Sequence, residues 1–212
     1  MRFITRMLAT FGFVLSLVTE ASTTGTSDQA AAQLRKQLDT MNTLQGNFKQ
    51  VLFDKEGKKQ DESSGTFMMQ RPGKFYWKTE KPAPQILISN QKMIWLYDPD
   101  LQTVNERPFS DDLQKTPTLI LSEDVEKLRK TFSINAAVNG KTEKYTLTPK
   151  VTDGMFQELI LVFNDNQLSE FHIRDNLGQL TDFVLTNTQR NQPVNETLFN
   201  FVAPAGVDII RN

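Results

Sequence analysis

Few residues in the sequence have the types needed for a catalytic or metal-binding site. His172 is the only histidine, and the chain has no cysteine, which excludes thiolate metal sites, disulfides and cysteine nucleophiles. A Ser–His–acid triad would have to use His172, but this residue lies in a strand-like stretch and no Gly-x-Ser-x-Gly motif occurs. The sequence therefore predicts a protein that is not an enzyme and that uses no metal and no cofactor.

The acidic residues and the net charge argue against two further kinds of site. Asp98, Asp100, Glu106, Asp111 and Asp112 fall at expected turns and loop starts, and they do not follow the spacing of an EF-hand. The chain has 24 basic and 25 acidic residues, so its formal net charge is −1. Nucleic-acid binding normally needs a basic surface, and we therefore expect no nucleic-acid partner.

The N-terminus has the pattern of an export signal. Arg2 and Arg6 precede an apolar stretch at 7–18, and small residues follow it, with Ala21 as the last residue before the expected cleavage. The apolar stretch is shorter than the ~20 residues that span a bilayer. We interpret residues 1–21 as a signal peptide and 22–212 as a single exported domain. A membrane anchor is the weaker alternative, and the absence of cysteine excludes a lipid anchor.

One helix is expected near the start of this domain. Ser27 or Asp28 can cap a helix that runs toward Thr43. Apolar residues follow it at helical spacing on one face, whereas polar residues occupy the other. The apolar residues are Ala31, Leu34, Leu38 and Met41, and the polar ones are Gln33, Arg35, Lys36, Gln37 and Asp39. Such a helix must cover an apolar surface, which we expect to be a sheet.

From residue 44 onward the apolar pattern has a period of two, which is typical of strands. The predicted strands are 47–54, 64–71, 73–79, 85–90, 92–98, 101–107, 131–138, 143–150, 156–164, 167–174, 178–188 and 197–202. Short turns between them predict an antiparallel meander. One sheet of so many strands must curl, so we expect a mainly β fold. The predicted architecture is a single, incompletely closed antiparallel barrel of about eleven strands.

The strand pattern is interrupted in the middle of the chain. A polar stretch at 109–115 is followed by a short predicted helix that Thr116 caps, with Pro117 in its first turn. A second short helix is predicted at 123–130, with acidic residues first and basic residues last. This insert separates the two halves of the sheet, and we expect it to cover an open end.

Several strands are apolar on both faces. The stretches 86–88, 93–97 and 159–163 contain no polar residue, and the chain holds 15 Phe and seven Met. A plain core beneath the helix and the insert explains part of this pattern. The alternative is that one face lines a cavity, since large and deformable side chains suit a pocket for varied acyl chains.

The stretch Gln70-Arg71-Pro72-Gly73-Lys74-Phe75-Tyr76-Trp77 resembles the Arg-Pro-x-x-Phe-x-Trp signature of the periplasmic outer-membrane lipoprotein carrier family, LolA. The resemblance continues through 88–99, Thr116-Pro117, 147–150 and 199–208. It implies a curled barrel covered by helices, located in the periplasm of a Gram-negative bacterium. It also implies a monomeric carrier that takes acylated lipoproteins from an inner-membrane ABC-type releasing complex to an outer-membrane receptor.

The resemblance implies roles for individual residues. Arg71 would hold a helical lid at Pro117 to Ser122 by hydrogen bonds to carbonyls near Leu121 and Ser122, and Phe75 would serve cargo transfer. The plain alternatives are a surface ion pair for Arg71 and a core aromatic for Phe75. The expected cavity-lining residues are Phe67, Met69, Phe75, Trp77, Ile88 and Trp95, and the expected lid residues are Pro117, Leu119, Ile120, Leu121 and Ser122. The assignment of each side chain to one face of the sheet rests on the alternation along its strand. An error of one residue would therefore move these side chains to the opposite face.

A different function also fits the sequence. A chain with an apolar cavity and no docking partners would be a periplasmic binding module for free lipid or another small hydrophobic ligand. Bound intact lipoprotein would favour the carrier, whereas free phospholipid alone would favour the binding module.

Overall fold

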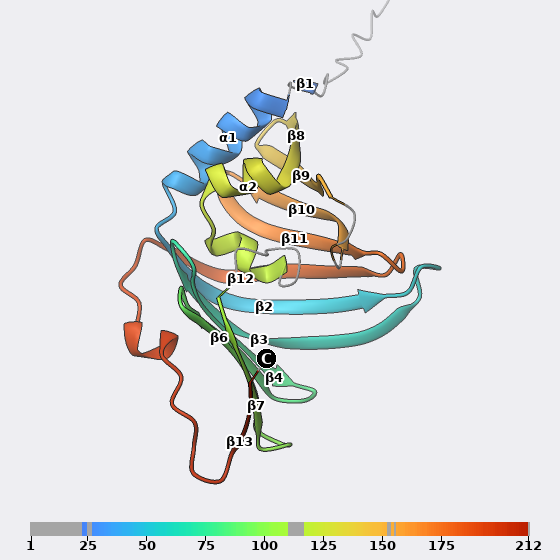
Figure 1. The fold of residues 1–212 in the computed structure, drawn as a ribbon. Helices are drawn as coiled ribbons and strands as arrows, with labels where there is room; N and C mark the ends of the chain where they lie inside the picture. Colours follow the sequence, from blue (N-terminus) through green and yellow to red (C-terminus); the bar gives the residue numbers. More distant parts are fainter. Residues whose placement is uncertain (1–22, 25–26, 110–116, 152–153, 155, 212) are drawn as a thin grey trace, which may run out of the picture.

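The computed structural model describes residues 23–24, 27–109, 117–151, 154 and 156–211. These residues form one large curled sheet that is covered by two α-helices and a 3-10 helix (Figure 1). The predicted signal peptide lies outside the described residues, as do Thr116 and the preceding polar residues 110–115.

The elements follow the chain in this order: β1 (Thr23–Thr24), α1 (Ser27–Asp39), β2 (Thr43–Phe53), β3 (Lys59–Gln70), β4 (Lys74–Lys81), β5 (Gln85–Asn90), β6 (Met93–Asp98), β7 (Thr103–Pro108), η2 (Pro117–Ser122), α2 (Val125–Thr131), β8 (Phe132–Asn139), β9 (Thr142–Pro149), β10 (Phe156–Asn164), β11 (Gln167–Asp175), β12 (Leu180–Arg190), η3 (Glu196–Phe199) and β13 (Asp208–Arg211). Here η denotes a 3-10 helix.

The sheet contains two meanders that join through the pairing of β12 with β2. Its strand order is β1-β8-β9-β10-β11-β12-β2-β3-β4-β5-β6-β7-β13, and the two ends do not pair with each other. The connection from β7 to β8 carries η2 and α2, and it must cross from one end of the sheet to the other. The described parts of this connection, η2 and α2, lie over one face of the sheet, whereas we expected from the sequence that the insert would cover an open end (Figure 1).

The predicted fold class is confirmed, with three differences in detail. Eleven predicted strands correspond to β2–β12, but the twelfth, 197–202, is wrong because η3 occupies its first half. Two short edge strands, β1 and β13, were not predicted. The strand β13 is also parallel to its neighbour β7, because the chain returns to that edge through residues 191–207.

Ring contacts show how strongly the sheet curls. Trp77 on β4 meets Phe171 on β11 edge-on, with ring centroids 6.1 Å apart. Four strand steps separate β4 from β11, which would be about 19 Å in a flat sheet with strands ~4.8 Å apart. The face that carries both rings must therefore be concave, and we call it the inner face.

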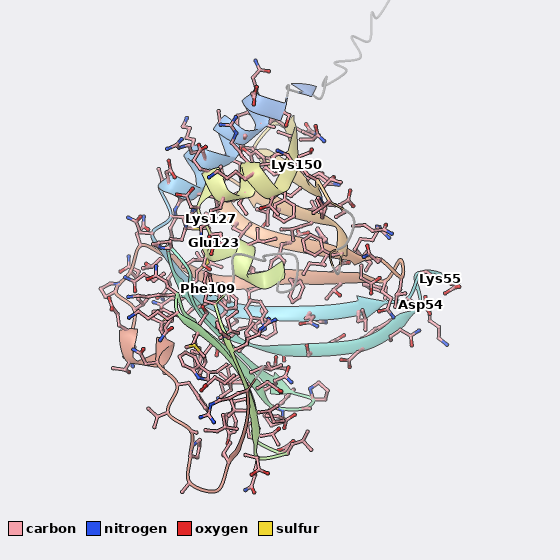
Figure 2. All side chains as sticks on the ribbon, viewed as in Figure 1. Asp54, Lys55, Phe109, Glu123, Lys127 and Lys150 are labelled. Carbon is pink, nitrogen blue, oxygen red and sulfur yellow. The ribbon has the colours of Figure 1, made fainter. Side chains whose placement is uncertain are left out.

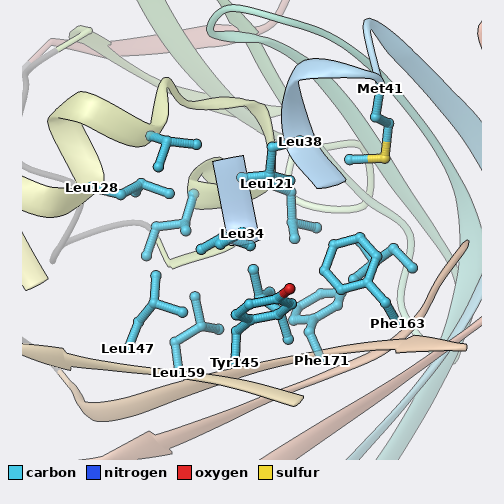
Figure 3. Close-up of a cluster of buried hydrophobic side chains, with 14 of the residues drawn as sticks. Leu34, Leu38, Met41, Leu121, Leu128, Tyr145, Leu147, Leu159, Phe163 and Phe171 are labelled. Atoms are coloured by element: carbon cyan, nitrogen blue, oxygen red, sulfur yellow. The ribbon is translucent and has the colours of Figure 1, made fainter. Parts of the chain in front are cut away.

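The inner face is closed by apolar residues from the helices. Leu34, Leu38 and Met41 from α1 and its C-terminal end are buried against the sheet, together with Leu121 and Leu128. Figure 3 shows these side chains facing Tyr145, Leu147, Leu159, Phe163 and Phe171 on the strands beneath. The predicted apolar stripe of the helix is thus confirmed, although α1 ends at Asp39 and not near Thr43.

One residue of the predicted polar helix face is buried. The side chain of Gln37 points to the sheet, where Nε2 donates to Oε1 of Glu143 at 3.0 Å and to Oδ1 of Asn166 at 2.8 Å. The residue is 6% exposed. A polar side chain tolerates such burial because its hydrogen bonds are satisfied.

The outer face of β4–β7 has a second apolar cluster. Ile88, Trp95 and Val104 are buried there, and Phe201 and Val207 of the C-terminal segment pack on them. Two contacts hold this segment in place. One is an ion pair between Nζ of Lys74 and Oε2 of Glu196 at 3.1 Å, and the other is a hydrogen bond from Nδ2 of Asn90 to Oδ1 of Asn200 at 3.2 Å. The doubly apolar stretches 86–88 and 93–97 are therefore covered on both faces, because Leu87 and Ile94 pack with the inner core and Ile88 and Trp95 pack under the end of the chain.

Candidate functional site

The ring of His172 on β11 lies beside two carboxylates, one on the neighbouring strand β12 and one on its own strand. Its Nδ1 lies 2.7 Å from Oδ1 of Asp182 on β12, and its Nε2 lies 3.6 Å from Oε2 of Glu170. Within the described part of the chain, no three acidic or histidine side chains come together as a possible metal site. His172 therefore links β11 to β12 through a side-chain contact.

Four of the predicted cavity-lining residues lie together on the inner face. Phe67 pairs directly with Trp77 across β3 and β4, and Met69 pairs directly with Phe75. Directly opposed residues point to the same face of a sheet, and all four side chains are buried. The register therefore places these residues in a single apolar surface.

Trp77 lies at the centre of this surface. Its ring stacks on Phe48 with centroids 3.9 Å apart and lies 5.6 Å from the ring of Phe183. The rings of Phe171 and Phe183 stack at 4.1 Å. Together with Phe67 and Phe75, these residues form a continuous aromatic surface that we call the aromatic basin.

The predicted facing of Ile88 and Trp95 is wrong. Trp77 is opposite Leu87, and Ser89 is opposite Ile94, so Ile88 and Trp95 point to the outer face. They pack under the C-terminal segment instead of lining the aromatic basin. The sequence pattern could not decide this, because both faces of these strands are apolar and a shift of one residue exchanges them.

The predicted lid, Pro117 to Ser122, forms the 3-10 helix η2. Three of its residues are buried: the exposed fraction is 0% for Ile120, 1% for Leu121 and 0% for Ser122. The side chains of Pro117 and Leu119 lie outside the described residues. Asp124 then caps α2 by accepting a hydrogen bond from the amide of Glu126. The lid thus presents an apolar surface to the aromatic basin, and a capped helix follows it directly.

Arg71 connects the sheet to the residue that follows the lid. Its Nη2 donates to the main-chain oxygen of Glu123 at 2.5 Å, and the predicted carbonyls near Leu121 and Ser122 are not its acceptors. The carbonyl of Ser122 is instead taken by the amide of Gly73 at 2.9 Å. Gly73 has φ +68° in the turn that follows Arg71, and glycine adopts this conformation without steric cost.

The guanidinium of Arg71 is in a low-dielectric environment. Burial lowers the pKa of Arg71, and the nearby charges of Asp39, Asp124 and Glu123 oppose that shift. A charged donor in such surroundings makes a stronger hydrogen bond than it would in water. The bond from Arg71 to the Glu123 carbonyl is therefore suited to holding the lid in place.

A pocket of about 400 Å³ borders this connection. It is lined by Pro72, Gly73, Gln91, Phe109, Glu123, Asp124 and Lys127. Figure 2 shows Phe109, Glu123 and Lys127 together on one flank of the molecule, next to η2. Nζ of Lys127 lies 3.5 Å from Oε2 of Glu123 and 6.0 Å from the ring centroid of Phe109.

Two residues of this site, and one that fixes α1, were missed by sequence reasoning. Gly73 supplies a main-chain donor to the lid, Glu123 supplies the acceptor and a buried carboxylate, and Gln37 fixes α1. The signature stretch contained a signal for Gly73, because glycine after proline predicts a turn. For Glu123 and Gln37 the local pattern indicated exposed helix, and only the packing of distant strands reveals their burial.

None of the helices in the described ranges has the length and apolar character required to span a bilayer. The two α-helices contain 13 and seven residues, and their apolar faces are turned to the sheet.

Comparisons with known proteins agree with this architecture. The chain matches the family model described as outer membrane lipoprotein carrier protein LolA over residues 39–202. It is 36% identical to the outer-membrane lipoprotein carrier protein of Pseudomonas fluorescens (strain Pf0-1) over 198 residues, which cover 93% of this chain and 95% of that protein. It is also 36% identical over 199 residues to the protein of the same name from Azotobacter vinelandii, covering 93% and 96%.

Solved structures share the fold at low sequence identity. An uncharacterized conserved protein from Thermus thermophilus is similar with a TM-score of 0.51 and 13% identity, covering 88% of this chain and 99% of that one. A DUF1329 family protein from Desulfovibrio piger is similar with a TM-score of 0.51 and 10% sequence identity. The match covers 82% of this chain and 95% of that one. The sequence matches and the shared fold together show that the chain belongs to the LolA family of outer membrane lipoprotein carrier proteins, whose members are carriers and not enzymes.

Proposed function

We propose that the chain carries acylated lipoproteins through the periplasm, from an inner-membrane ABC-type releasing complex to an outer-membrane receptor. The observation that carries this proposal is the aromatic basin, an apolar concave surface covered by a lid. Each methylene of an acyl chain removed from water contributes about 0.8 kcal/mol. A molecule with several acyl chains therefore needs such a surface to cross an aqueous compartment.

Acyl chains would bind by replacing the lid. Ile120 and Leu121 of the lid, and Leu128 of the helix α2 that follows it, are buried against the inner face in this closed arrangement. An acyl chain that displaces them exchanges one apolar contact for another, so the net free-energy change is small and cargo can be released without an energy source on the carrier. The bonds from Arg71 and Gly73 to the lid set the threshold for this exchange.

The remaining assignments follow from the same proposal. Residues 1–21 act as the signal peptide, and the exported chain works as a monomer. Phe75, which pairs with Met69 across β3 and β4, becomes accessible to cargo only after the lid moves, because it is 0% exposed in the closed arrangement. Phe67, Met69 and Trp77 then form the surface on which the acyl chains lie.

The carrier function is tested by a two-step transfer assay. Purified chain is incubated with spheroplasts, released lipoprotein is counted, and the loaded chain is then mixed with outer membranes. We expect soluble carrier–lipoprotein complexes in the first step and transfer in the second. If the chain recovered from the periplasm holds only free phospholipid and releases no lipoprotein, the binding-module function replaces the carrier.

Arg71→Leu tests the role of the lid within this assay. The variant loses the charged donor to Glu123, so the lid opens more easily and loading should persist. Delivery to outer membranes should fall more than loading, because lid closure no longer helps to expel the acyl chains. An equal loss in both steps would indicate misfolding, and unchanged delivery would remove Arg71 from the mechanism.

A further inference from the structure

Beside the lid, one side-chain atom of each of two buried charged groups lacks a hydrogen bond. Nη1 of Arg71 and Oε2 of Glu123 are inaccessible to solvent, and neither has a hydrogen-bond partner in the part of the chain that the structure describes. Glu123 is 1% exposed as a residue. The same two residues are already joined elsewhere, through Nη2 of Arg71 and the main-chain oxygen of Glu123.

Such groups are normally satisfied in folded proteins. A buried carboxylate or guanidinium atom without a hydrogen bond is costly, and native structures contain few of them. Lys127 balances the charge of Glu123 from 3.5 Å, but its own side chain is 45% exposed and water weakens the attraction. The closed lid therefore leaves Arg71 and Glu123 with complementary groups that do not bond to each other.

We propose that the carboxylate of Glu123 is a second hydrogen-bonding partner for Arg71, used when the lid lifts from the aromatic basin. The main-chain oxygen of Glu123 moves away with the lid, whereas its longer side chain can still reach the guanidinium. Arg–carboxylate pairs form two parallel hydrogen bonds and are stronger than a bond to a carbonyl. Glu123 is thus a positioning residue that stabilises the lifted lid, and its effect on cargo rests on the carrier function proposed above.

This arrangement gives Glu123 and Arg71 opposite effects on the lid. Arg71 also makes the bond that holds the lid closed, so its removal favours opening. Glu123→Gln keeps the main-chain acceptor of the closed state and removes only the carboxylate, which favours closure. A residue that merely stabilised the closed lid would produce the reverse when replaced.

The amide of Gly73 reports the position of the lid directly. It donates to the carbonyl of Ser122, so its hydrogen exchange requires that the lid lift. In the cargo-free chain we expect Glu123→Gln to slow exchange at this amide about tenfold, the difference between a charged and a neutral partner. Arg71→Leu should accelerate it. Faster exchange in Glu123→Gln would overturn the proposal.

Cargo retention provides a second measurement. A fluorescent, triacylated cysteinyl peptide is bound to the full exported chain, and its dissociation is followed after dilution. We expect dissociation from Glu123→Gln to be about tenfold faster than from the wild type. In a chain that already carries Arg71→Leu, adding Glu123→Gln should change neither hydrogen exchange at Gly73 nor lipopeptide dissociation. If Glu123→Gln has the same effect with and without Arg71, the proposed bond between the two side chains is contradicted.

Glu126→Gln is the matched control for loss of one acidic charge on the same segment. Its carboxylate is 50% exposed and pairs with Arg35 on α1, so both measurements should stay at the wild-type value. If the wild type binds no lipopeptide, the carrier function fails, while exchange at Gly73 still decides whether Glu123 and Arg71 are coupled. If Glu123→Gln changes only the thermal midpoint, and the two variants do not shift hydrogen exchange at Gly73 in opposite directions, Glu123 has only a structural role.

Discussion

Gln37 in α1 donates a hydrogen bond from Nε2 to Oε1 of Glu143 on β9 at 3.0 Å. The other oxygen of this carboxylate accepts a hydrogen bond from the hydroxyl of Tyr145, which is buried beneath α1 (Figure 3). The C-terminal end of α1 is therefore held by a polar network in addition to its apolar face. The lid, in contrast, is held to the β3–β4 turn by the bonds from Arg71 and Gly73.

Arg190 is the main charged donor at the end of α1. It bonds to the carbonyls of Gln37 at 3.0 Å, Thr40 at 3.2 Å and Asn166 at 2.8 Å. We expect Arg190→Ala to lower the free energy of unfolding by about 3 kcal/mol, since hydrogen bonds from charged groups contribute ~1.5–3 kcal/mol each and water replaces part of them. Urea denaturation measures this change.

Arg35→Ala is the control for Arg190→Ala. Arg35 lies on the same helix and pairs with Asp39 and Glu126, but its side chain is 55% exposed. Exposed pairs contribute about 0–1 kcal/mol, so this variant should stay within that range. Equal losses for Arg190→Ala and Arg35→Ala would show that the end of α1 is not specially fixed.

Tyr145 should make the fold sensitive to alkaline pH. Burial, together with the hydrogen bond to Glu143, raises the pKa of Tyr145 above its ordinary value. Above about pH 10 the unfolded chain loses this proton while the folded chain keeps it, so stability present below that pH declines as pH rises. The contribution of one such proton is about 1.4 kcal/mol per pH unit.

Tyr145→Phe removes this contribution. The variant should lose about 1 kcal/mol at neutral pH, because Glu143 loses a donor, and its stability should decline less steeply than that of the wild type between pH 10 and 11. Urea midpoints at several pH values provide the comparison. Parallel pH profiles for the two proteins would contradict the raised pKa.

The fold was largely predictable because its pattern is local. Apolar residues of period two define β2–β12, and the stripe through Leu34 and Leu38 defines the buried face of α1. The segment 197–202 resembled a strand in the sequence because Phe199 and Phe201 flank the polar Asn200. In the structure Phe199 belongs to the 3-10 helix η3, and Phe201 packs on the outer face without joining the sheet there. Alternation of apolar and polar residues indicates which side chains are buried. It does not indicate whether the main chain forms hydrogen bonds to a neighbouring strand.

The site was predictable only in part, for a related reason. Phe67, Met69, Phe75 and Trp77 share a face that alternation identifies once the strands are known. The facing of Trp95 depends on the C-terminal segment covering the outer face, which no local pattern reveals. Buried polar groups such as Glu123 were missed because a polar residue in a short helix is usually exposed, and its burial depends on the distant turn at Arg71.

Gly65 should be essential for the pairing of β3 with β4. A Cβ atom at this position would lie 1.9 Å from the main-chain oxygen of Lys78, a distance that the sheet cannot accommodate. We expect Gly65→Ala to destabilise the fold by more than about 2 kcal/mol, because the ladder beneath Trp77 must shift. Thermal unfolding measures the loss.

Gly140→Ala is a useful comparison for Gly65→Ala. Gly140 has φ +57° in the β8–β9 turn, and its Cβ would meet no atom within 4 Å. Its replacement should cost only about 1 kcal/mol of backbone strain. A loss at Gly140 as large as that at Gly65 would mean that backbone conformation, and not the close approach of β4, explains the need for glycine.

The two tryptophans lie on opposite faces and allow a direct test of where acyl chains bind. Trp77 is in the aromatic basin, whereas Trp95 lies under the C-terminal segment and donates from Nε1 to Glu106 at 3.0 Å. Trp95→Phe leaves Trp77 as the single indole, and Trp77→Phe leaves Trp95. A triacylated lipopeptide with brominated acyl chains should strongly quench Trp77 fluorescence in the first variant, since bromine quenches on contact. It should leave the fluorescence of Trp95 in the second variant nearly unchanged.

The non-brominated lipopeptide is the control for changes in emission that come from conformational change, and far-ultraviolet circular dichroism checks that both variants fold. Quenching of Trp95 without quenching of Trp77 would place the acyl chains on the outer face and exclude the aromatic basin as their binding surface.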